Sequence, residues 1–169
     1  KNLETLIDAV HILKNKSHKL LLEIVGGSET ADQKNYENLL REKVLAMHLE
    51  HEVVFTGPLS QAETVPKVQH SDLFVNTSKT GSLDKAVLEA MSCGVPVLTS
   101  NEAFASMLSS YGLMFESGNA EELARMIESL LVDMNRCAEL GVQLRKEIVE
   151  HHELGSLIVR ILHHYETSR

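Results

Sequence analysis

Short, largely apolar runs alternate along this chain with amphipathic segments of helical period. The runs cover residues 19–25, 53–55, 73–75, 95–98 and 113–115. Strands that are apolar at every position are buried on both faces, as in parallel sheets, and parallel strands need long crossovers that are usually helical. The alternation therefore predicts an α/β fold, a doubly wound Rossmann-like parallel sheet with helices on both faces.

Helices are predicted where apolar residues recur every three or four positions between these runs. The first covers residues 2–14, a charged one covers 32–47, and a helical tail covers 135–166. The helix over 32–47 is expected to bury one face, which carries Tyr36, Leu39, Leu40 and Val44.

The composition is that of an ordinary globular domain with an acidic balance. The chain has 169 residues, 43% hydrophobic and 24% charged, and a net charge of −8. This length suits one domain, so residues 1–169 are expected to form a single unit. The negative charge argues against a nucleic-acid partner and against a membrane-surface patch, because both need a basic face. The apolar runs are too short to span a bilayer. Cys93 and Cys137 are expected to be reduced, which suits a cytoplasmic protein.

The segment from residue 78 to 99 joins a polar loop with a glycine, a helix and a buried strand. A loop that feeds a helix N-terminus can bind an anion, because the first N–H groups lack partners and the helix dipole favours negative charge. Glu89 lies further along that helix, where a carboxylate can reach a sugar hydroxyl. Together these features predict a site for a nucleotide diphosphate and its ribose.

Each of these features also has a purely structural interpretation. Gly81 and Ser82 can form only a turn and a helix N-cap, and Glu89 can be one exposed residue of a surface helix. Gly26 and Gly27 can simply end a strand. The order of loop, helix and a closing Gly-Val-Pro-Val favours the binding interpretation.

Nine histidines invite a metal site, but their spacing does not support one. His151-His152 and His163-His164 are adjacent pairs, and adjacent residues on a helix point about 100° apart. We therefore expect no metal ligands and no cofactor.

Several sequence blocks occur in the order found in one enzyme family. The series resembles the C-terminal domain of family 4 glycosyltransferases ("glycosyl transferases group 1"), which have the GT-B fold. This resemblance implies a domain that binds a nucleotide diphosphate-sugar donor. A separate N-terminal domain would bind the acceptor, and transfer in the cleft between them would retain the anomeric configuration. The blocks are 1–9, 24–27, 54–57, 71–75, 88–91 and 94–97.

The resemblance also implies roles for particular residues. Lys1 matches a lysine that neutralises the diphosphate, and Glu89 matches the glutamate that accepts from the ribose hydroxyls, so these two are the expected catalytic residues. Gly26 and Gly27 would line the donor site, and main-chain groups near Pro58 and Leu59 would contact the base. The phosphates would be held by the loop residues Thr80, Gly81, Ser82 and Leu83.

Gly81 marks a departure from the family pattern. The first glutamate of the family's Glu–seven residues–Glu motif, which contacts the transferred sugar, would fall at Gly81, and glycine has no side chain for that contact. Asp84 or Lys85 would then take over part of the sugar contact, or the donor sugar would differ.

The resemblance places one more strand in the middle of the sheet, directly before Lys1 and between the strands at 19–25 and 72–76. Without it, two rows of backbone groups would lack partners. Either this strand and the acceptor domain lie upstream of the chain, or another element occupies the position.

These observations favour the donor-binding domain of a retaining glycosyltransferase, inactive by itself. It would serve polysaccharide or glycoconjugate synthesis in the cytoplasm or at the cytoplasmic membrane face, with a glycan or lipid-linked acceptor. The alternatives are a non-catalytic nucleotide-sugar-binding module, a nucleotide-sugar epimerase of the same fold, and an unrelated doubly wound signalling domain. The last alternative is disfavoured, because this sequence lacks the acidic cluster that such signalling receivers need at their strand ends.

Overall fold

The computed structural model describes residues 2–79 and 81–151, together with residues 155 and 158. Lys1 and Thr80 lie outside the described residues, as does most of the predicted helical tail beyond residue 151. The strands are β1 (Leu22–Val25), β2 (Val53–Gly57), β3 (Phe74–Asn76) and β4 (Val97–Thr99). The helices are α1 (Leu3–Asn15), α2 (Ala31–Ala46), α3 (Gln61–Gln69), α4 (Lys85–Ser92), α5 (Ala105–Leu108), α6 (Ala120–Val132) and α7 (Met134–His151), with 3₁₀ turns η1 (Glu102–Phe104) and η2 (Ser109–Tyr111) flanking α5.

All strand pairing is parallel, as the apolar runs predict. β1 pairs with β2, with Leu22 opposite Val53, and β3 pairs with β4, with Asn76 opposite Thr99. The strand predicted at 113–115 is only a single parallel bridge, between Thr99 and Met114. The α/β fold with parallel strands and covering helices is thus confirmed.

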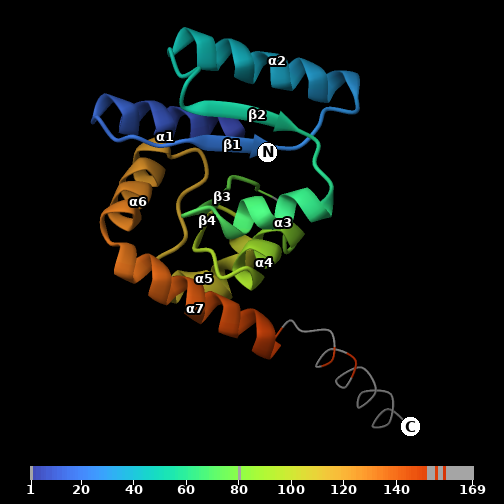
Figure 1. The fold of residues 1–169 in the computed structure, drawn as a ribbon, viewed down its shortest axis with the longest axis vertical. Coiled ribbons are helices and arrows are strands. Elements are labelled where there is room, and N and C mark those ends of the chain that lie inside the picture. Colours follow the sequence, from blue (N-terminus) through green and yellow to red (C-terminus); the bar gives the residue numbers. More distant parts are fainter. Residues whose placement is uncertain (1, 80, 152–154, 156–157, 159–169) are drawn as a thin grey trace.

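The strands form two separate two-stranded sheets rather than one continuous sheet. Within the described residues, no hydrogen bond joins β1 or β2 to β3 or β4. Figure 1 shows the β1–β2 pair beneath α2, and β3 and β4 in the other half of the molecule. This division matches the break that the resemblance predicts between the strands at 19–25 and 72–76.

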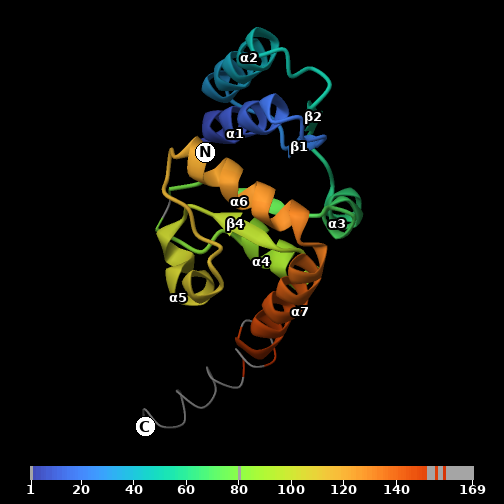
Figure 2. The same ribbon diagram turned by 90° about the vertical axis from the view of Figure 1, so that its left-hand side faces the viewer.

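Helix α1 connects the two halves through its packing. Its residues Ile7 and Val10 join a buried cluster with α2, while Leu6, Ala9 and Leu13 join the larger cluster that includes α6. Figure 2 shows α1 lying along α6. The first apolar helix of the chain therefore buries two faces, one toward each sheet.

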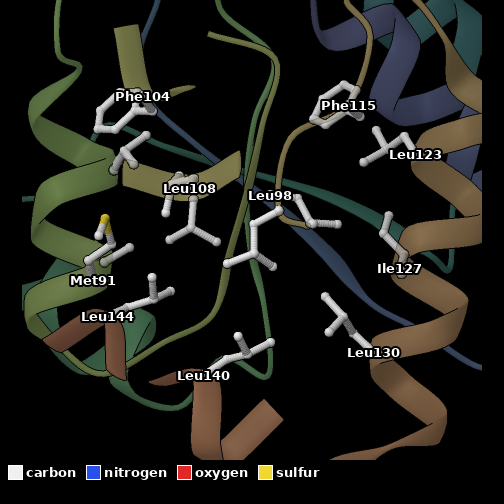
Figure 3. Close-up of a cluster of buried hydrophobic side chains, with 14 of the residues drawn as sticks. Met91, Leu98, Phe104, Leu108, Phe115, Leu123, Ile127, Leu130, Leu140 and Leu144 are labelled. Carbon is white, nitrogen blue, oxygen red and sulfur yellow. The ribbon is translucent and has the colours of Figure 1, made fainter. Parts of the chain in front are cut away.

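The larger core is centred on β4. Leu98 is fully buried, and Figure 3 shows it between Met91 and Leu108 on one side and Ile127 and Leu130 on the other. These side chains come from α4, α5 and α6, so β4 is covered on both faces. This explains why the run around Leu98 is apolar at every position.

Helix α2 buries a narrower face than the sequence predicts. Leu40 and Val44 are buried and Tyr36 is partly buried, but Leu39 is 62% exposed. The prediction for Leu39 was therefore wrong. Position 39 lies beside the stripe formed by positions 36, 40 and 44, and α2 packs only through that stripe.

Tyr36 ties α2 to the start of α1. Its hydroxyl donates to Glu4 Oε2 at 2.5 Å and accepts from the Leu3 N–H at 3.0 Å. Burial and the bond to Glu4 raise the pKa of Tyr36 to about 12. The phenol therefore stays neutral over the physiological range and keeps donating this bond.

The C-terminal end of α4 is fixed by α7 at very close range. A Cβ built on Gly141 of α7 would lie 2.1 Å from the carbonyl oxygen of Gly94, which follows α4. Arg145 of α7 donates to the Ser92 carbonyl oxygen at 2.9 Å. Only a glycine at position 141 permits this approach, and it sets the position of α4.

We expect the ion-pair cluster around Glu128 to make stability depend on pH. Glu128 of α6 pairs with Lys16 at 2.5 Å and His18 at 2.8 Å, near the end of α1. The hydrogen bonds from Lys16, then His18, hold the pKa of Glu128 below its usual value. A carboxyl with a depressed folded-state pKa contributes its stability above its unfolded pKa and loses it as pH falls through the folded pKa.

Thermal unfolding of the Glu128→Gln variant tests this cluster. The melting temperature should fall modestly at neutral pH, and the difference from wild type should vanish in acid. Glu121→Gln on the same helix is the matched control, because Glu121 is exposed and forms no ion pair within the described chain. A difference that persists unchanged in acid would contradict an ionic origin.

None of the helices in the described part of the chain is long and apolar enough to cross a membrane. Within the same part, Cys93 and Cys137 are free.

Candidate functional site

The residues after the strands of each pair are the natural place to look for a ligand, because open α/β sheets bind ligands beyond the carboxyl ends of their strands. In the β1–β2 pair these residues are Gly26 and Gly27 after β1, and Pro58 and Leu59 after β2. In the β3–β4 pair they are two polar stretches, 76–78 and 99–101.

The first half of the candidate site is built around close backbone contacts. The Gly26 N–H donates to the Gly57 carbonyl oxygen at 3.0 Å. A Cβ on Gly27 would lie 3.1 Å from Pro58 Cβ, so a larger residue at position 27 would press against the proline ring. The structure therefore brings Gly26, Gly27 and Pro58 together, while the neighbouring Leu59 is half-buried.

The second half rests on a buried polar network at the ends of β3 and β4. Asn76 Oδ1 accepts from Thr99 Oγ1 at 3.0 Å and from Ser78 Oγ at 3.0 Å. The Asn101 N–H donates to Thr99 Oγ1 at 3.1 Å. These four residues are all buried. Because buried polar groups need partners, the network fixes the ends of both strands relative to each other.

The loop before α4 is attached to this network at two points. Asn101 Nδ2 donates to the Ser82 carbonyl oxygen at 2.9 Å. Asn76 Nδ2 donates to Asp84 Oδ2 at 3.0 Å, and Asp84 Oδ1 caps α4 by accepting from the Ala86 N–H at 3.2 Å. Both carboxylate oxygens of Asp84 thus have protein partners.

The predicted phosphate-binding residues of this loop are open to solvent. Gly81, Ser82 and Leu83 are exposed, and Leu83 presents 42% of its surface. Within the described residues, the amides of Ser82 and Leu83 donate no hydrogen bond. They are available to a ligand, but the carboxylate of Asp84 opposes an anion at the helix N-terminus itself.

Glu89 and Lys85 lie on α4, one turn apart. Both are exposed, and neither side chain has a hydrogen-bond or ion-pair partner within the described residues. The Glu89 carboxylate is therefore free to accept from hydroxyl groups of a ligand.

The start of the chain lies beside the carboxyl end of β3. The Asn2 N–H donates to the Thr77 carbonyl oxygen at 3.4 Å, so the residue that follows Lys1 is next to the polar network. Thr77 Oγ1 is buried and has no partner in the described part of the protein. An unpartnered buried hydroxyl is costly.

The predicted site residues therefore form two groups. One contains Gly26, Gly27 and Pro58, and the other contains residues 81–85 with Glu89. Within the described residues no hydrogen bond connects the two groups, which lie on separate sheets.

Sequence reasoning missed Asn76, Thr77 and Asn101. A signal for them exists, because the polar triplets Asn-Thr-Ser at 76–78 and Thr-Ser-Asn at 99–101 each begin at the last residue of a strand. In a parallel pair such triplets meet, so complementary amide and hydroxyl groups can bond across the strands.

Two other features bear on ligand and metal binding. An open depression of about 490 Å³ is lined by residues 116–121, including Glu116 and Glu121, so its charge disfavours an anion. Within the described residues, no group of three or more His, Cys, Asp or Glu side chains could hold a metal ion.

Known proteins are similar to this chain in sequence over much of its length. It is 27% identical, over 156 residues, to an uncharacterized glycosyltransferase of Methanocaldococcus jannaschii, covering 89% of this chain and 38% of that protein. It is 31% identical over 122 residues to a GDP-mannose-dependent monoacylated alpha-(1-6)-phosphatidylinositol monomannoside mannosyltransferase of Corynebacterium glutamicum, covering 67% of this chain and 32% of that protein. The chain thus spans about a third of the length of these curated relatives.

Solved structures share its fold at lower identity. Anabaena HepE in complex with UDP superposes with a TM-score of 0.87 at 21% identity, covering 99% of this chain and 45% of HepE. The C-terminal domain of a glycosyl transferase group 1 protein from Francisella tularensis superposes with a TM-score of 0.79 at 18% identity, covering 91% of this chain and 80% of that domain. The fold is that of a GT-B glycosyltransferase domain.

The family description "Glycosyl transferases group 1" matches residues 1–151, nearly the whole described chain. Together with the GT-B fold, this match shows that the chain belongs to the group 1 glycosyltransferase family.

Proposed function

We propose that this chain is the donor-binding domain of a retaining glycosyltransferase and holds a nucleotide diphosphate-sugar. The observation that carries the proposal is Glu89, an exposed carboxylate without a protein partner, one turn into the helix that follows the open loop at 81–83. Family membership gives this arrangement its meaning. UDP is bound by HepE, and a GDP-sugar is used by the Corynebacterium relative, so nucleotide diphosphates occur as ligands among similar proteins.

Each candidate residue has a chemical task in this proposal. The Glu89 carboxylate accepts from the ribose hydroxyls, and the exposed amides of Ser82 and Leu83 bind the diphosphate. Lys1 and the dipole of α4 supply positive charge for the departing diphosphate, which a net charge of −8 otherwise disfavours. In the other half, Gly26 and Gly27 line the donor site, and main-chain groups near Pro58 and Leu59 contact the base.

The proposal also assigns roles to Thr80 and Asp84. Thr80 would add to the phosphate contacts with Gly81. Asp84 can contact the sugar only in addition to its two existing hydrogen bonds, so Lys85 is the better-placed substitute for the missing glutamate at position 81.

The rest of the enzyme follows from the same proposal. A preceding strand would complete the divided sheet, and an N-terminal domain would bind a glycan or lipid-linked acceptor in the cytoplasm or at the cytoplasmic membrane face. The reaction would need no metal or other cofactor. This domain alone would not catalyse transfer, because the acceptor site would be absent.

Thermal unfolding of the full-length protein with UDP, GDP and ADP tests donor binding. A nucleotide present at about 100 times its dissociation constant stabilises the folded state by roughly 2.7 kcal/mol. We expect one base to raise the melting temperature clearly above the other two. An unchanged melting temperature with all three nucleotides would contradict the proposal.

A second function, a non-catalytic nucleotide-sugar-binding module, is favoured by one observation. Gly81 stands where the family's first motif glutamate would contact the transferred sugar. This candidate requires nucleotide-sugar binding without transfer or donor hydrolysis. Product analysis of the full-length protein with a bound donor distinguishes it from the enzyme, and an epimerised donor would indicate an epimerase.

A further inference from the structure

Two buried asparagines form hydrogen bonds to the loop before α4. Asn101, which is fully buried, bonds the Ser82 carbonyl oxygen, and Asn76, 7% exposed, bonds the Asp84 carboxylate. Thr99 Oγ1 links them by donating to Asn76 Oδ1 and accepting from the Asn101 N–H. The loop is exposed, but its attachments are buried and connected.

This arrangement affects ligand binding because an unattached loop would lose conformational freedom when it closes on a ligand. Ordering one residue costs roughly 1–2 kcal/mol, and a loop that is ordered beforehand avoids that cost on binding. The bond from Asn101 fixes the main chain at Ser82, where the free amides begin. The bond from Asn76 fixes Asp84, which caps α4 and so sets the direction in which the loop enters the helix.

We propose that Asn76 and Asn101 are positioning residues that preorganise the loop for the diphosphate of the donor, with Asp84 acting as the link between Asn76 and α4. This inference rests on the proposed donor-binding function. Neither asparagine contacts the donor in this account. Asp84 contributes by receiving the Asn76 hydrogen bond, and a direct contact between Asp84 and the sugar is not needed.

Exchanging the two partners of the Asn76–Asp84 bond separates positioning from direct contact. Asp84→Asn keeps an oxygen to cap the Ala86 N–H but places two amide donors against each other. Asn76→Asp places two carboxylates against each other. The double variant Asn76→Asp/Asp84→Asn restores one donor and one acceptor in the reverse order. Asn101→Asp replaces the donor to Ser82 by a carboxylate oxygen, while its Oδ1 still accepts from the Ala103 N–H.

The measurement is the dissociation constant for UDP and for GDP, by titration calorimetry of the full-length protein at a temperature where circular dichroism shows each variant to be folded. Asn101→Asp should weaken binding of the nucleotide that wild type prefers by about tenfold, the effect of one lost hydrogen bond. Asp84→Asn should weaken it by less, because the loss of the Asn76 bond is partly offset by removal of a carboxylate that opposes an anion. The double variant should recover most of that affinity.

Asn119→Asp is the matched control. Asn119 caps α6 by accepting from the Glu122 N–H at 3.0 Å, and its Nδ2 donates to Glu116 Oε2 at 3.2 Å. It thus loses the same kind of amide–carboxylate bond away from the loop, and nucleotide affinity should not change. If Asn76→Asp does not fold, Asp84→Asn, Asn101→Asp and the double variant still provide the comparison.

The possible results distinguish failure of the proposed donor binding from failure of the positioning role. Wild type that binds neither nucleotide contradicts the proposed function, and this inference falls with it. Wild type that binds while Asp84→Asn and Asn101→Asp bind equally well overturns the positioning role alone. If Asp84→Asn weakens binding and the double variant does not recover it, Asp84 contacts the donor directly and the positioning account is wrong.

Discussion

Replacing Gly141 by alanine should destabilise this protein by about 3 kcal/mol or more, the upper part of the range for overpacked sites. A Cβ at this position would lie 2.1 Å from the Gly94 carbonyl oxygen and 3.1 Å from its carbonyl carbon. Both are backbone atoms, so no side chain can rotate away. Either α7 must shift or the turn after α4 must move, and both displace buried residues of the larger core.

The sign of this effect is informative because helix propensity predicts the opposite. Alanine in a helix interior is favoured over glycine by about 1 kcal/mol. Circular dichroism measures the melting temperature of Gly141→Ala. A lower value than in wild type would show that the close contact outweighs the helix propensity of alanine. Val142→Ala is the control, since Val142 is the next residue on α7 and is 71% exposed. A higher melting temperature in Gly141→Ala would show that the two helices are farther apart.

Replacing Glu89 by alanine should weaken nucleotide binding by roughly 1–3 kcal/mol, which is about 5- to 150-fold in the dissociation constant. The carboxylate is proposed to accept from both ribose hydroxyls, and hydrogen bonds to charged groups are the stronger kind. Glu89→Gln keeps the length of the side chain but only one accepting oxygen, so its loss should be smaller. Calorimetric titration of the full-length protein with its preferred nucleotide measures both.

The melting temperature of the ligand-free variants shows whether a loss of affinity comes from a lost ligand contact or from a destabilised fold. Glu89 is exposed and its carboxylate has no partner in the described chain, so neither variant should lower the melting temperature of the ligand-free protein. Glu139→Ala is the control, because Glu139 is another exposed helical glutamate, located on α7. Unchanged affinity in Glu89→Ala would remove the ribose contact from the proposal and leave Glu89 as an ordinary surface residue.

Local patterns were sufficient to predict most of the secondary structure. The helix predicted at 2–14 is α1, the one at 32–47 is α2, and the strand predicted at 53–55 is β2 extended to Gly57. The run at 95–98 identifies β4 because that strand is covered on both faces, whereas burial alternates along β1, where Glu23 and Val25 are exposed. The run at 113–115 forms only one bridge, since a short apolar run shows burial but not how many partners a strand finds.

The exposed residues of the candidate site were predictable from the sequence, but the buried residues that form hydrogen bonds to its loop were not. Glu89 and the loop before α4 are recognisable from residue types at fixed spacing. The roles of Asn76 and Asn101 were not, because asparagine is common in exposed loops and only burial makes its hydrogen bonds obligatory. The same limit applies to Asp84, whose type suits a sugar contact and a helix cap equally well.

The sequence by itself determined the α/β class, the parallel pairing and the order of helices and strands, because these follow from periodicity and burial along the chain. Tertiary structure decided that Leu39 is exposed, that Gly141 meets Gly94, and that two polar triplets join beneath one loop. These facts depend on contacts between residues far apart in the chain. Which face of a helix is covered, and which backbone atoms nearly touch, is set by packing that no local pattern records.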